Sequence, residues 1–249
     1  ALLGPSGCGK STLLNILSKL ENVTSGKVNI NCKLGYMFQK DNLMDWRNIY
    51  NNITLGLEIN HLKTKENLEY VDSLLKKYDL YDFKNYYPQE LSGGMKRRVG
   101  LAQAILGNPP VLIVDEPTVG VDPEERIKIR KLLNEYAEKN TVLFSTHIIE
   151  DIEYICDKLA ILDNGKLLYS GSIEDLLKSV QGKIYEARFN TKDELHKFEE
   201  SHTVISFKRD DTQVRAIVIC ENDAEPSSIP YKPTLEEVYV YLTTIKGGK

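Results

Sequence analysis

The sequence predicts a doubly wound α/β fold, and three observations point to it. A Gly-rich turn near the start of the chain leads into a helical stretch over 11–20. The run 111–114 is continuously apolar and rich in β-branched residues, which is typical of a parallel strand covered on both faces. An amphipathic helix and a second apolar strand over 141–144 follow it. Strands that alternate with helices in this way indicate a parallel sheet with helices on both faces.

The composition is that of an ordinary globular protein. The chain has 249 residues, of which 41% are hydrophobic and 27% are charged, and its formal net charge is −4. This length predicts one large domain or a main domain with an appendix. The small negative charge gives no general electrostatic reason to bind nucleic acid, so no nucleic-acid partner is expected. The apolar stretches are strand-sized, far below the roughly 20 residues of a membrane helix, so we expect no spanning segment.

The cysteines are scattered along the chain without paired spacing. They predict neither a zinc site nor a disulfide framework, and a reducing cytoplasm fits them best. The four are Cys8, Cys32, Cys156 and Cys220.

Three zones follow one another along the main domain. The first, 1–30, reads as the end of a strand, the Gly-rich turn, the helix and a further strand over 26–30. Because the chain opens on the end of a strand, we expect the fold to begin before residue 1. The second zone, about 41–106, has mainly helical spacing and is predicted as a helical subdomain. The third zone contains the strand–helix–strand unit described above.

Beyond about residue 180 the pattern changes to short alternating strands. Capping boxes predict two helices in this part, one opened by Thr191 with Glu194 and one opened by Thr234 with Glu237. We therefore predict a main domain over 1–180 and a small α+β appendix over 181–249. The predicted strands of the appendix are 183–189, 203–208 and 213–220.

The Gly-rich turn is a full match to the phosphate-binding pattern G-x-x-x-x-G-K-[ST]. Its glycines let the backbone wrap closely, so that successive N–H groups point at phosphate oxygens, and the next helix adds its positive end. Lys10 would reach the β- and γ-phosphates, Ser11 would coordinate Mg²⁺, and Thr12 would help to hold the turn. A chance match in a chain of this length has a probability of about one in a hundred. The turn reads Gly4, Pro5, Ser6, Gly7, Cys8, Gly9, Lys10, Ser11.

An acidic pair, Asp115 and Glu116, stands at the carboxyl end of the apolar strand. This is the edge at which α/β sheets bind their ligands. Alone, such a pair is most often a solvated turn. Beside a phosphate-binding turn, Asp115 is predicted to hold the Mg²⁺ shell and Glu116 to polarise an attacking water.

Further motifs make the sequence resemble the ABC family of ATPases over about residues 1–170. The segment 91–95 resembles the signature motif of that family, and it precedes the acidic strand at the distance the family uses. The other matching positions appear in the order of that family: the Q-loop glutamine Gln39, the D-loop at Val121 and Asp122, and the switch histidine His147.

The resemblance implies a P-loop NTPase core that binds ATP and Mg²⁺. It implies that Gln39 senses Mg²⁺ and the attacking water, and that His147 contacts the γ-phosphate. It further implies that the signature residues Ser92 and Gly94 clamp the ATP held by a second copy of the domain. Gly93 and Asp122 are predicted to belong to the same nucleotide-binding set.

Several of these residues have a plainer alternative. Ser92 and Asp122 are both suited to cap a helix, and either residue can serve both purposes. A histidine after a strand, such as His147, is often structural. Trp46 could be an ordinary core tryptophan or part of an exposed docking surface with Leu43 and Met44.

The sequence also departs from the family pattern. Met95 replaces the commoner glutamine of the signature, a change we expect to be tolerated. Family members carry two antiparallel strands and an adenine-stacking aromatic residue before the P-loop. Residues 1–249 do not include this segment, so we expect weak ATP affinity or poor folding of these residues alone. The front half resembles importers, whereas 116–130 and the tail over 233–239 resemble exporters of the ABC-2 type.

The leading hypothesis is the ATPase subunit of an ABC transporter. Two copies would face head to tail, and separate membrane-spanning permease subunits would place the chain at the cytoplasmic face of the membrane. Two alternatives stay open, a non-transport ABC ATPase of translation or DNA repair and a regulatory ATP sensor.

Overall fold

The protein is seen in a computed structural model, which describes residues 1–209, 213–219 and 229–245. The contacts divide the chain into two units, Ala1–Ile155 and Cys156–Lys249, which are described separately. The predicted boundary of the ATPase domain at residue 180 stays a prediction. Cys220 and the last residue of the strand expected over 213–220 lie outside the described residues.

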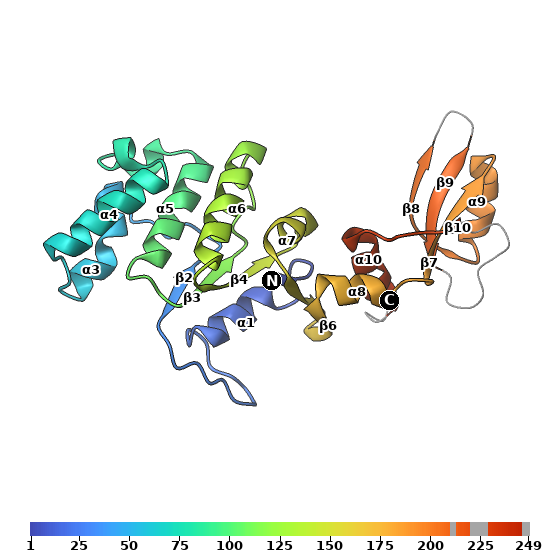
Figure 1. The fold of residues 1–249 in the computed structure, drawn as a ribbon, viewed down its shortest axis with the longest axis horizontal. Coiled ribbons are helices and arrows are strands. Elements are labelled where there is room, and N and C mark those ends of the chain that lie inside the picture. The colour runs from blue at the N-terminus through green and yellow to red at the C-terminus, as the bar shows by residue number, and fades with distance from the viewer. Residues whose placement is uncertain (210–212, 220–228, 246–249) are drawn as a thin grey trace. The chain divides into compact units, whose positions relative to one another are not determined.

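The first unit is built on a parallel sheet with the order β2-β3-β4-β1. Residues Leu112, Val114 and Phe144 are buried in its centre, as the continuous apolar runs predict. Helix α6 (Pro123–Ala137) connects β3 to β4, and β4 lies between β3 and β1 (Figure 1). This confirms the predicted α/β class. The strands are β1 (Leu2–Leu3), β2 (Leu34–Met37), β3 (Val111–Asp115) and β4 (Thr141–Thr146).

The register of the sheet brings three strand ends to one edge. Asp115 of β3 lies opposite Ser145 of β4, and Leu3 of β1 lies opposite Thr146. The P-loop leaves β1 at this edge and enters α1 (Lys10–Leu17). Helix α7 (Ile149–Ile155) follows β4.

The segment between β2 and β3 is helical, as its spacing predicts. In α4 (Lys65–Lys77) the side chains of Val71, Leu74 and Leu75 are buried. The signature segment opens α5 (Gly93–Ile105). The remaining helices are α2 (Ile49–Ile53), α3 (Leu55–Ile59) and the short 3₁₀ turns η1 (Tyr81–Phe83) and η2 (Pro88–Glu90).

The strand predicted over 26–30 is wrong. These residues are irregular and almost all are exposed. Their alternation of polar and apolar residues is typical of an edge strand, but a strand exists only when a neighbour satisfies its backbone groups, and no described strand pairs with this segment. The strand of this region is β2, a few residues later, where Leu34–Met37 pair with Val111–Val114 of β3.

The second unit begins with a hairpin of β5 (Lys158–Asp163) and β6 (Lys166–Ser172), followed by α8 (Ile173–Ser179). Asn164 and Gly165 in its turn both have positive φ, at 47° and 73°. An antiparallel sheet in the order β10-β7-β9-β8 comes next. Its strands are β7 (Ile184–Phe189), β8 (Thr203–Arg209), β9 (Val214–Ile219) and β10 (Ile229–Pro230).

Two helices complete the second unit, as the capping boxes predict. Helix α9 (Lys192–Glu199) packs on one face of the sheet through Leu195. Helix α10 (Leu235–Ile245) starts with the reciprocal bonds of a capping box between Thr234 and Glu237. At α9 the box is partial, because Glu194 accepts from the N–H of Asn190 instead of Thr191. Within the described residues, no helix is long and apolar enough to cross a membrane.

Candidate functional site

The P-loop forms a cradle that the protein itself leaves open. Gly7 and Gly9 have φ of 82° and 103°, a region that other residues rarely adopt, and beyond their chain neighbours no described atom lies within 4 Å of the point where a Cβ would stand. The loop and its surroundings enclose a cavity of about 200 Å³. Bare backbone around an open, polar space fits a phosphate chain. The lining residues are Ser6, Gly7, Gly9, Lys10, Ser11, Thr12, Gln39 and Glu116.

Lys10 lies inside this cradle and is only 4% exposed. Its Nζ donates to the carbonyl oxygens of Gly4 and Pro5, at 2.8 and 3.1 Å, and lies 3.4 Å from Glu116 Oε1. A buried ammonium group surrounded by loop carbonyls is fixed where a phosphate oxygen would arrive.

The Glu116 carboxylate is the point at which the predicted site residues meet. Besides Lys10, the Gln39 amide nitrogen lies 3.5 Å from Oε2, and His147 Nδ1 lies 3.2 Å from the carboxylate. Glu116 is 6% exposed. The structure therefore brings together Lys10, Gln39, Glu116 and His147, which are spread over more than a hundred positions of the sequence.

The backbone of Glu116 is held in an unusual conformation, with φ of 47°. A non-glycine residue in the left-handed region is strained and needs support from its surroundings. Ser145 supplies that support, because its carbonyl and its Oγ both accept from the Glu116 N–H, at 3.2 and 3.1 Å. The Ser145 hydroxyl in turn donates to Asp115 Oδ1. One buried serine on β4 thus positions both Asp115, the last residue of β3, and Glu116, which follows it.

The donors at this edge suit a hard cation such as Mg²⁺. Asp115 is 3% exposed at the end of β3, and the hydroxyl of Ser11 lines the cavity. Oxygen ligands from one carboxylate and one hydroxyl are what Mg²⁺ takes at phosphate sites, where the phosphates and water supply the rest. Asp115 is not itself among the lining residues of the cavity.

A buried polar cluster centred on Asp151 supports the segments that carry Glu116 and His147, and sequence reasoning missed it. Asp151 is fully buried, and it accepts from the Thr118 hydroxyl, from the Thr146 hydroxyl at 3.3 Å and from Arg130 Nε at 2.7 Å. It therefore joins the loop after Glu116 to the residue before His147. In the sequence Asp151 looks like an ordinary acidic residue in the first turn of a helix.

The signature residues lie outside the cavity of their own chain. Ser92 caps α5 by accepting from the Met95 N–H at 3.2 Å, so its structural role is confirmed. Gly94 is buried against α6, where a Cβ would come within 2.5 Å of Glu125 Cγ. Neither Ser92, Gly93 nor Gly94 lines the P-loop cavity.

The expectation that the Asp122 side chain caps α6 is wrong. Asp122 stands at the N-cap position of α6, but its side chain accepts no hydrogen bond from the helix. Pro123 occupies the first helical position and has no N–H, so the first turn of α6 has one fewer group to satisfy. The structure thus leaves the Asp122 carboxylate without the capping role that the sequence suggests.

The loop that carries Gln39 is fastened to the signature helix. Arg97 of α5 donates to the carbonyl oxygens of Phe38 and Gln39, and its guanidinium lies 3.7 Å from the Asp41 carboxylate. A few residues further on, Trp46 is 77% exposed, which excludes a core role for it.

Comparison with known proteins identifies the family. The model of the ABC transporter family matches residues 1–119. A methionine import ATP-binding protein from Carboxydothermus hydrogenoformans is 34% identical, with 99% of this chain and 78% of the relative covered. An aliphatic sulfonates import ATP-binding protein from Zymomonas mobilis is 38% identical over 67% of this chain and 71% of its own length. For a second methionine import ATP-binding protein, from Bacillus cereus, the chain spans 59% of the length.

Among solved structures, a dimeric ATP-binding cassette in a post-hydrolysis state, bound to ADP and Pi, matches with a TM-score of 0.63. The match has 30% sequence identity and covers 69% of this chain and 84% of the cassette. The fold, the P-loop cavity and a similarity that runs along nearly the whole chain lead to one conclusion. The chain belongs to the ABC transporter family, as an ATP-binding and ATP-hydrolysing protein.

Proposed function

We propose that ATP hydrolysis by this chain powers the uptake of a small solute through separate permease subunits at the cytoplasmic face of a membrane. The named relatives are import ATP-binding proteins, which favours uptake over export. The observation that carries the catalytic part is the convergence of Lys10, Gln39 and His147 on the Glu116 carboxylate.

In this proposal the P-loop N–H groups and Lys10 hold the triphosphate. When ATP is bound, the γ-phosphate replaces Glu116 as the partner of Lys10, and the Glu116 carboxylate is released to accept a proton from the attacking water. Gln39 and His147 donate toward the water and the γ-phosphate, where negative charge develops. Ser11 and Asp115 would hold Mg²⁺, and the ion would supply positive charge beside the phosphates.

A second copy of the chain completes the site. The signature helix begins at exposed residues, Ser92 and Gly93, whose N–H groups and hydroxyl are absent from the cavity of their own chain. In a head-to-tail dimer they would face the ATP of the partner, together with Asp122. The dimeric cassette among the similar structures supports this arrangement.

The permease subunits are proposed to dock on the stretch after Gln39. Leu43 and Met44 are half-buried there and Trp46 is exposed, so the chain presents an apolar surface beside the site that hydrolyses ATP. Arg47 beside it is held in place by an ion pair with Glu58 at 2.6 Å. Contact at this stretch would link the membrane subunits to Gln39.

The catalytic assignment is tested with Glu116→Gln, which keeps the shape of the side chain and removes the base. We expect steady-state ATP hydrolysis to fall by about 10²–10⁴-fold, because general-base catalysis contributes that much. ATP-bound dimers should accumulate instead, as seen by size-exclusion chromatography.

Glu124→Gln on the exposed surface of α6 is the matched control and should hydrolyse ATP at the wild-type rate. If Glu116→Gln hydrolysed ATP as fast as this control, the general base would be another residue. Failure to accumulate dimers would favour an ATP sensor that works as a single chain.

A further inference from the structure

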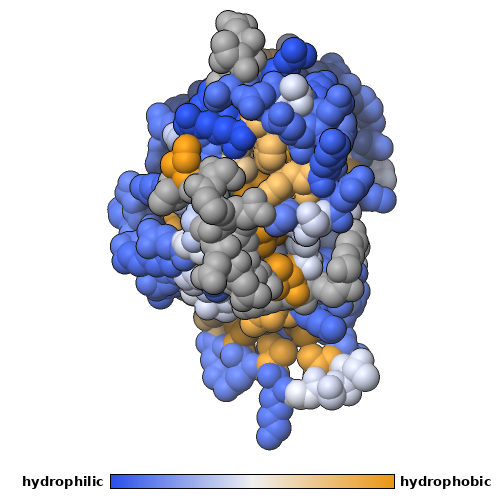
Figure 2. Space-filling view, turned by 90° about the vertical axis from the view of Figure 1, so that its right-hand side faces the viewer, coloured by the Kyte–Doolittle hydropathy of each residue, from blue (hydrophilic) through white to orange (hydrophobic). Residues whose placement is uncertain are grey.

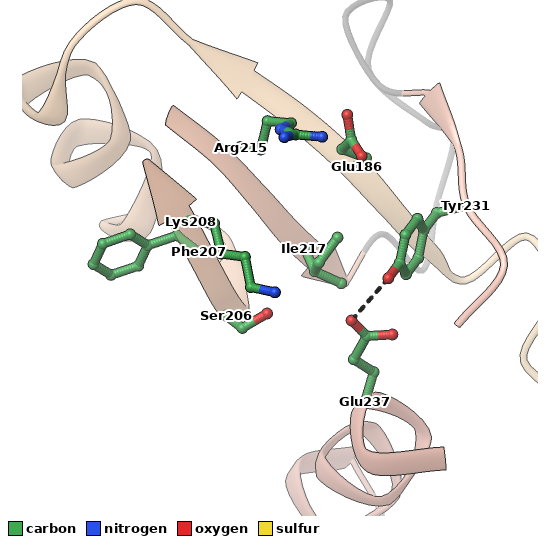
Figure 3. A pocket seen from close by; sticks show the side chains of 8 residues that line it. All are labelled: Glu186, Ser206, Phe207, Lys208, Arg215, Ile217, Tyr231 and Glu237. Carbon is green, nitrogen blue, oxygen red and sulfur yellow. Dashed lines mark hydrogen bonds between the residues drawn. The ribbon is translucent and has the colours of Figure 1, made fainter. Parts of the chain in front are cut away.

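Among the described residues, one buried charged side chain, Arg98, takes no part in the site or in the cluster that supports it. Charged side chains normally stay in water, as on the mostly hydrophilic side of the molecule in Figure 2, because burying a charge is costly. In the second unit the buried carboxylate of Glu237 has a clear role, since it caps α10 and accepts from the Tyr231 hydroxyl (Figure 3). The burial of Arg98 is not required by the proposed chemistry alone. The charged residues buried in the described parts of the chain are Lys10, Arg98, Asp115, Glu116, Asp151 and Glu237.

Arg98 lies on α5 and is only 5% exposed. Its guanidinium faces the carboxylate of Glu125 on α6, with Nε 3.0 Å from Oε2 and Nη2 3.4 Å from Oε1. Its Nη1 donates at 2.6 Å to the carbonyl oxygen of Tyr78, directly after α4. Two nitrogens that face two carboxylate oxygens fix direction as well as distance. One buried side chain thus joins the signature helix to α6 and to the end of α4.

The contact between α5 and α6, which run side by side in Figure 1, continues to their first residues. Gly94 lies one turn before Arg98 on the same face of α5. Its bare backbone receives the stem of Glu125, whose Cγ lies 2.5 Å from the point where a Gly94 Cβ would stand. The same point at Gly93 lies 3.9 Å from the carbonyl oxygen of Gly120, in the loop that precedes α6. The starts of the two helices are therefore held close together.

We propose that the ion pair of Arg98 and Glu125 positions the signature segment beside Asp122, so that both meet the partner's ATP together. This role rests on the head-to-tail dimer of the proposed function. In that dimer Ser92 and Asp122 come from different helices and must reach one nucleotide, which requires a fixed spacing between α5 and α6. A misplacement of about 1 Å can cost on the order of 100-fold in rate. Neither Arg98 nor Glu125 lines the P-loop cavity of its own chain, so both act as positioning residues for the partner's site.

Steady-state ATP hydrolysis by Glu125→Gln tests the pair, because the substitution keeps the stem against Gly94 and removes the charge that faces Arg98. We expect kcat to fall at least about tenfold. The KM for ATP should stay within about twofold of the wild type, since the P-loop is unchanged. Glu124→Gln is the matched control, because Glu124 is 83% exposed and, like its neighbour Glu125, pairs with Lys128. Equal kcat for the two variants would overturn the proposal.

A double variant separates positioning from stability. Glu125→Gln alone leaves the Arg98 guanidinium buried without its counter-charge, which by itself destabilises a fold. Arg98→Met combined with Glu125→Gln removes both charges, so its thermal midpoint should return close to that of the wild type. Its kcat should nevertheless stay at least about tenfold low, because the contact that aligns the helices is gone. A double variant with both the midpoint and the kcat of the wild type would show that the pair serves only the fold, and it would overturn the proposal.

Mixed dimers show which site the pair serves. Glu125→Gln is mixed at equal concentration with Lys10→Ala, which lacks the phosphate contact, and separately with Ser92→Asp, which alters the signature segment. With Lys10→Ala, one site of each mixed dimer has an intact P-loop from the first chain and an intact signature segment from the second. Phosphate release should therefore rise at least about twofold above the mean of the two separate rates. With Ser92→Asp no such rise is expected, since both chains carry a defective signature segment.

The outcomes of mixing distinguish the role of the pair from the dimer itself. Recovery with Ser92→Asp, or with neither variant, would overturn the proposal, because the pair would then serve its own P-loop or only the fold. A mixture of Lys10→Ala and Ser92→Asp tests the dimer without altering the pair. No recovery there would refute the dimer together with the role of the pair, whereas recovery there alone would refute only the role of the pair.

Discussion

At the scale of single residues, the site depends on buried groups that never touch ATP in the proposed mechanism. Ser145 holds the strained backbone of Glu116 and the carboxylate of Asp115 together. Asp151 connects the segments that carry Glu116 and His147. These contacts fix the reacting groups before the nucleotide arrives, which lowers the reorganisation that catalysis would otherwise require.

The Asp151 cluster gives the first stability prediction. Asp151→Asn leaves Arg130, whose side chain is only 12% exposed, without its main counter-charge, because their 2.7 Å contact joins it to a fully buried carboxylate. We expect a loss of about 3 kcal/mol in the free energy of unfolding, the usual result of breaking a buried pair from one side. Urea unfolding followed by circular dichroism measures it.

The double variant Asp151→Asn with Arg130→Gln is the control for this interpretation. Removing both charges should recover much of the loss, since no unpaired ion remains. If the two losses simply added, the pair would contribute little and the cluster would be held by its hydroxyl groups.

At the scale of elements, Gly35 determines how closely the signature helix lies against the sheet. A Cβ at Gly35 would come within 2.2 Å of the Ala104 carbonyl oxygen of α5 and 2.8 Å of Pro109 Cγ. A backbone oxygen cannot turn aside as a side chain can, so β2 and α5 would have to separate.

Gly35→Ala is therefore expected to lower the free energy of unfolding by at least about 2 kcal/mol. Gly56→Ala is the matched control, because Gly56 lies in α3 with no atom within 4 Å of its Cβ position. Alanine favours a helix over glycine by up to about 1 kcal/mol, so this control should be as stable as the wild type or more stable. Chemical denaturation of both variants checks the pair, and equal stabilities would contradict the close packing.

The elements also show where prediction from sequence succeeds. β3, α6 and β4 are predicted because continuous apolar runs and one amphipathic helix leave few alternatives. β2 was missed because Leu34–Met37 is short and contains a glycine, a residue that is unfavourable in strands. The close approach of α5 requires a glycine at this position. The segment 26–30 has the alternation of polar and apolar residues that is typical of a strand, but no described strand pairs with it. Local pattern cannot supply information about a neighbouring strand.

The same limit applies to the site. Motifs locate Lys10, Gln39, Glu116 and His147, because these positions match the ordered motifs of the ABC family. Apart from the contact between Asp151 and Thr146, Ser145 and Asp151 act through partners 21 to 33 positions away, so only the folded chain identifies their roles. The exposure of Trp46 likewise depends on packing.

At the scale of the whole molecule, the proposed dimer requires each site to draw residues from two chains. A mixture of two inactive variants tests this directly. Lys10→Ala removes the phosphate contact, whereas Ser92→Asp keeps a good helix cap and sets a negative charge against the partner's ATP. Each variant alone should be inactive.

Mixing the two variants should restore hydrolysis, because a mixed dimer has one site with both a wild-type P-loop and a wild-type signature helix. With random pairing the recovered rate should be on the order of a quarter of the wild type. The measurement is phosphate release after mixing at equal concentrations. No recovery at any ratio would mean that the signature residues do not serve the partner's site.

The bonds from Arg97 to the carbonyls after β2 have a mechanical consequence. Together with the close approach at Gly35, they join the signature helix to the Gln39 segment, so we expect the two to move together. A second chain that pulled on the start of α5 would shift Gln39 relative to Glu116. The same shift would displace the exposed Trp46 surface. Binding of the second chain would then change the surface that the permease subunits contact, although those subunits never touch the nucleotide.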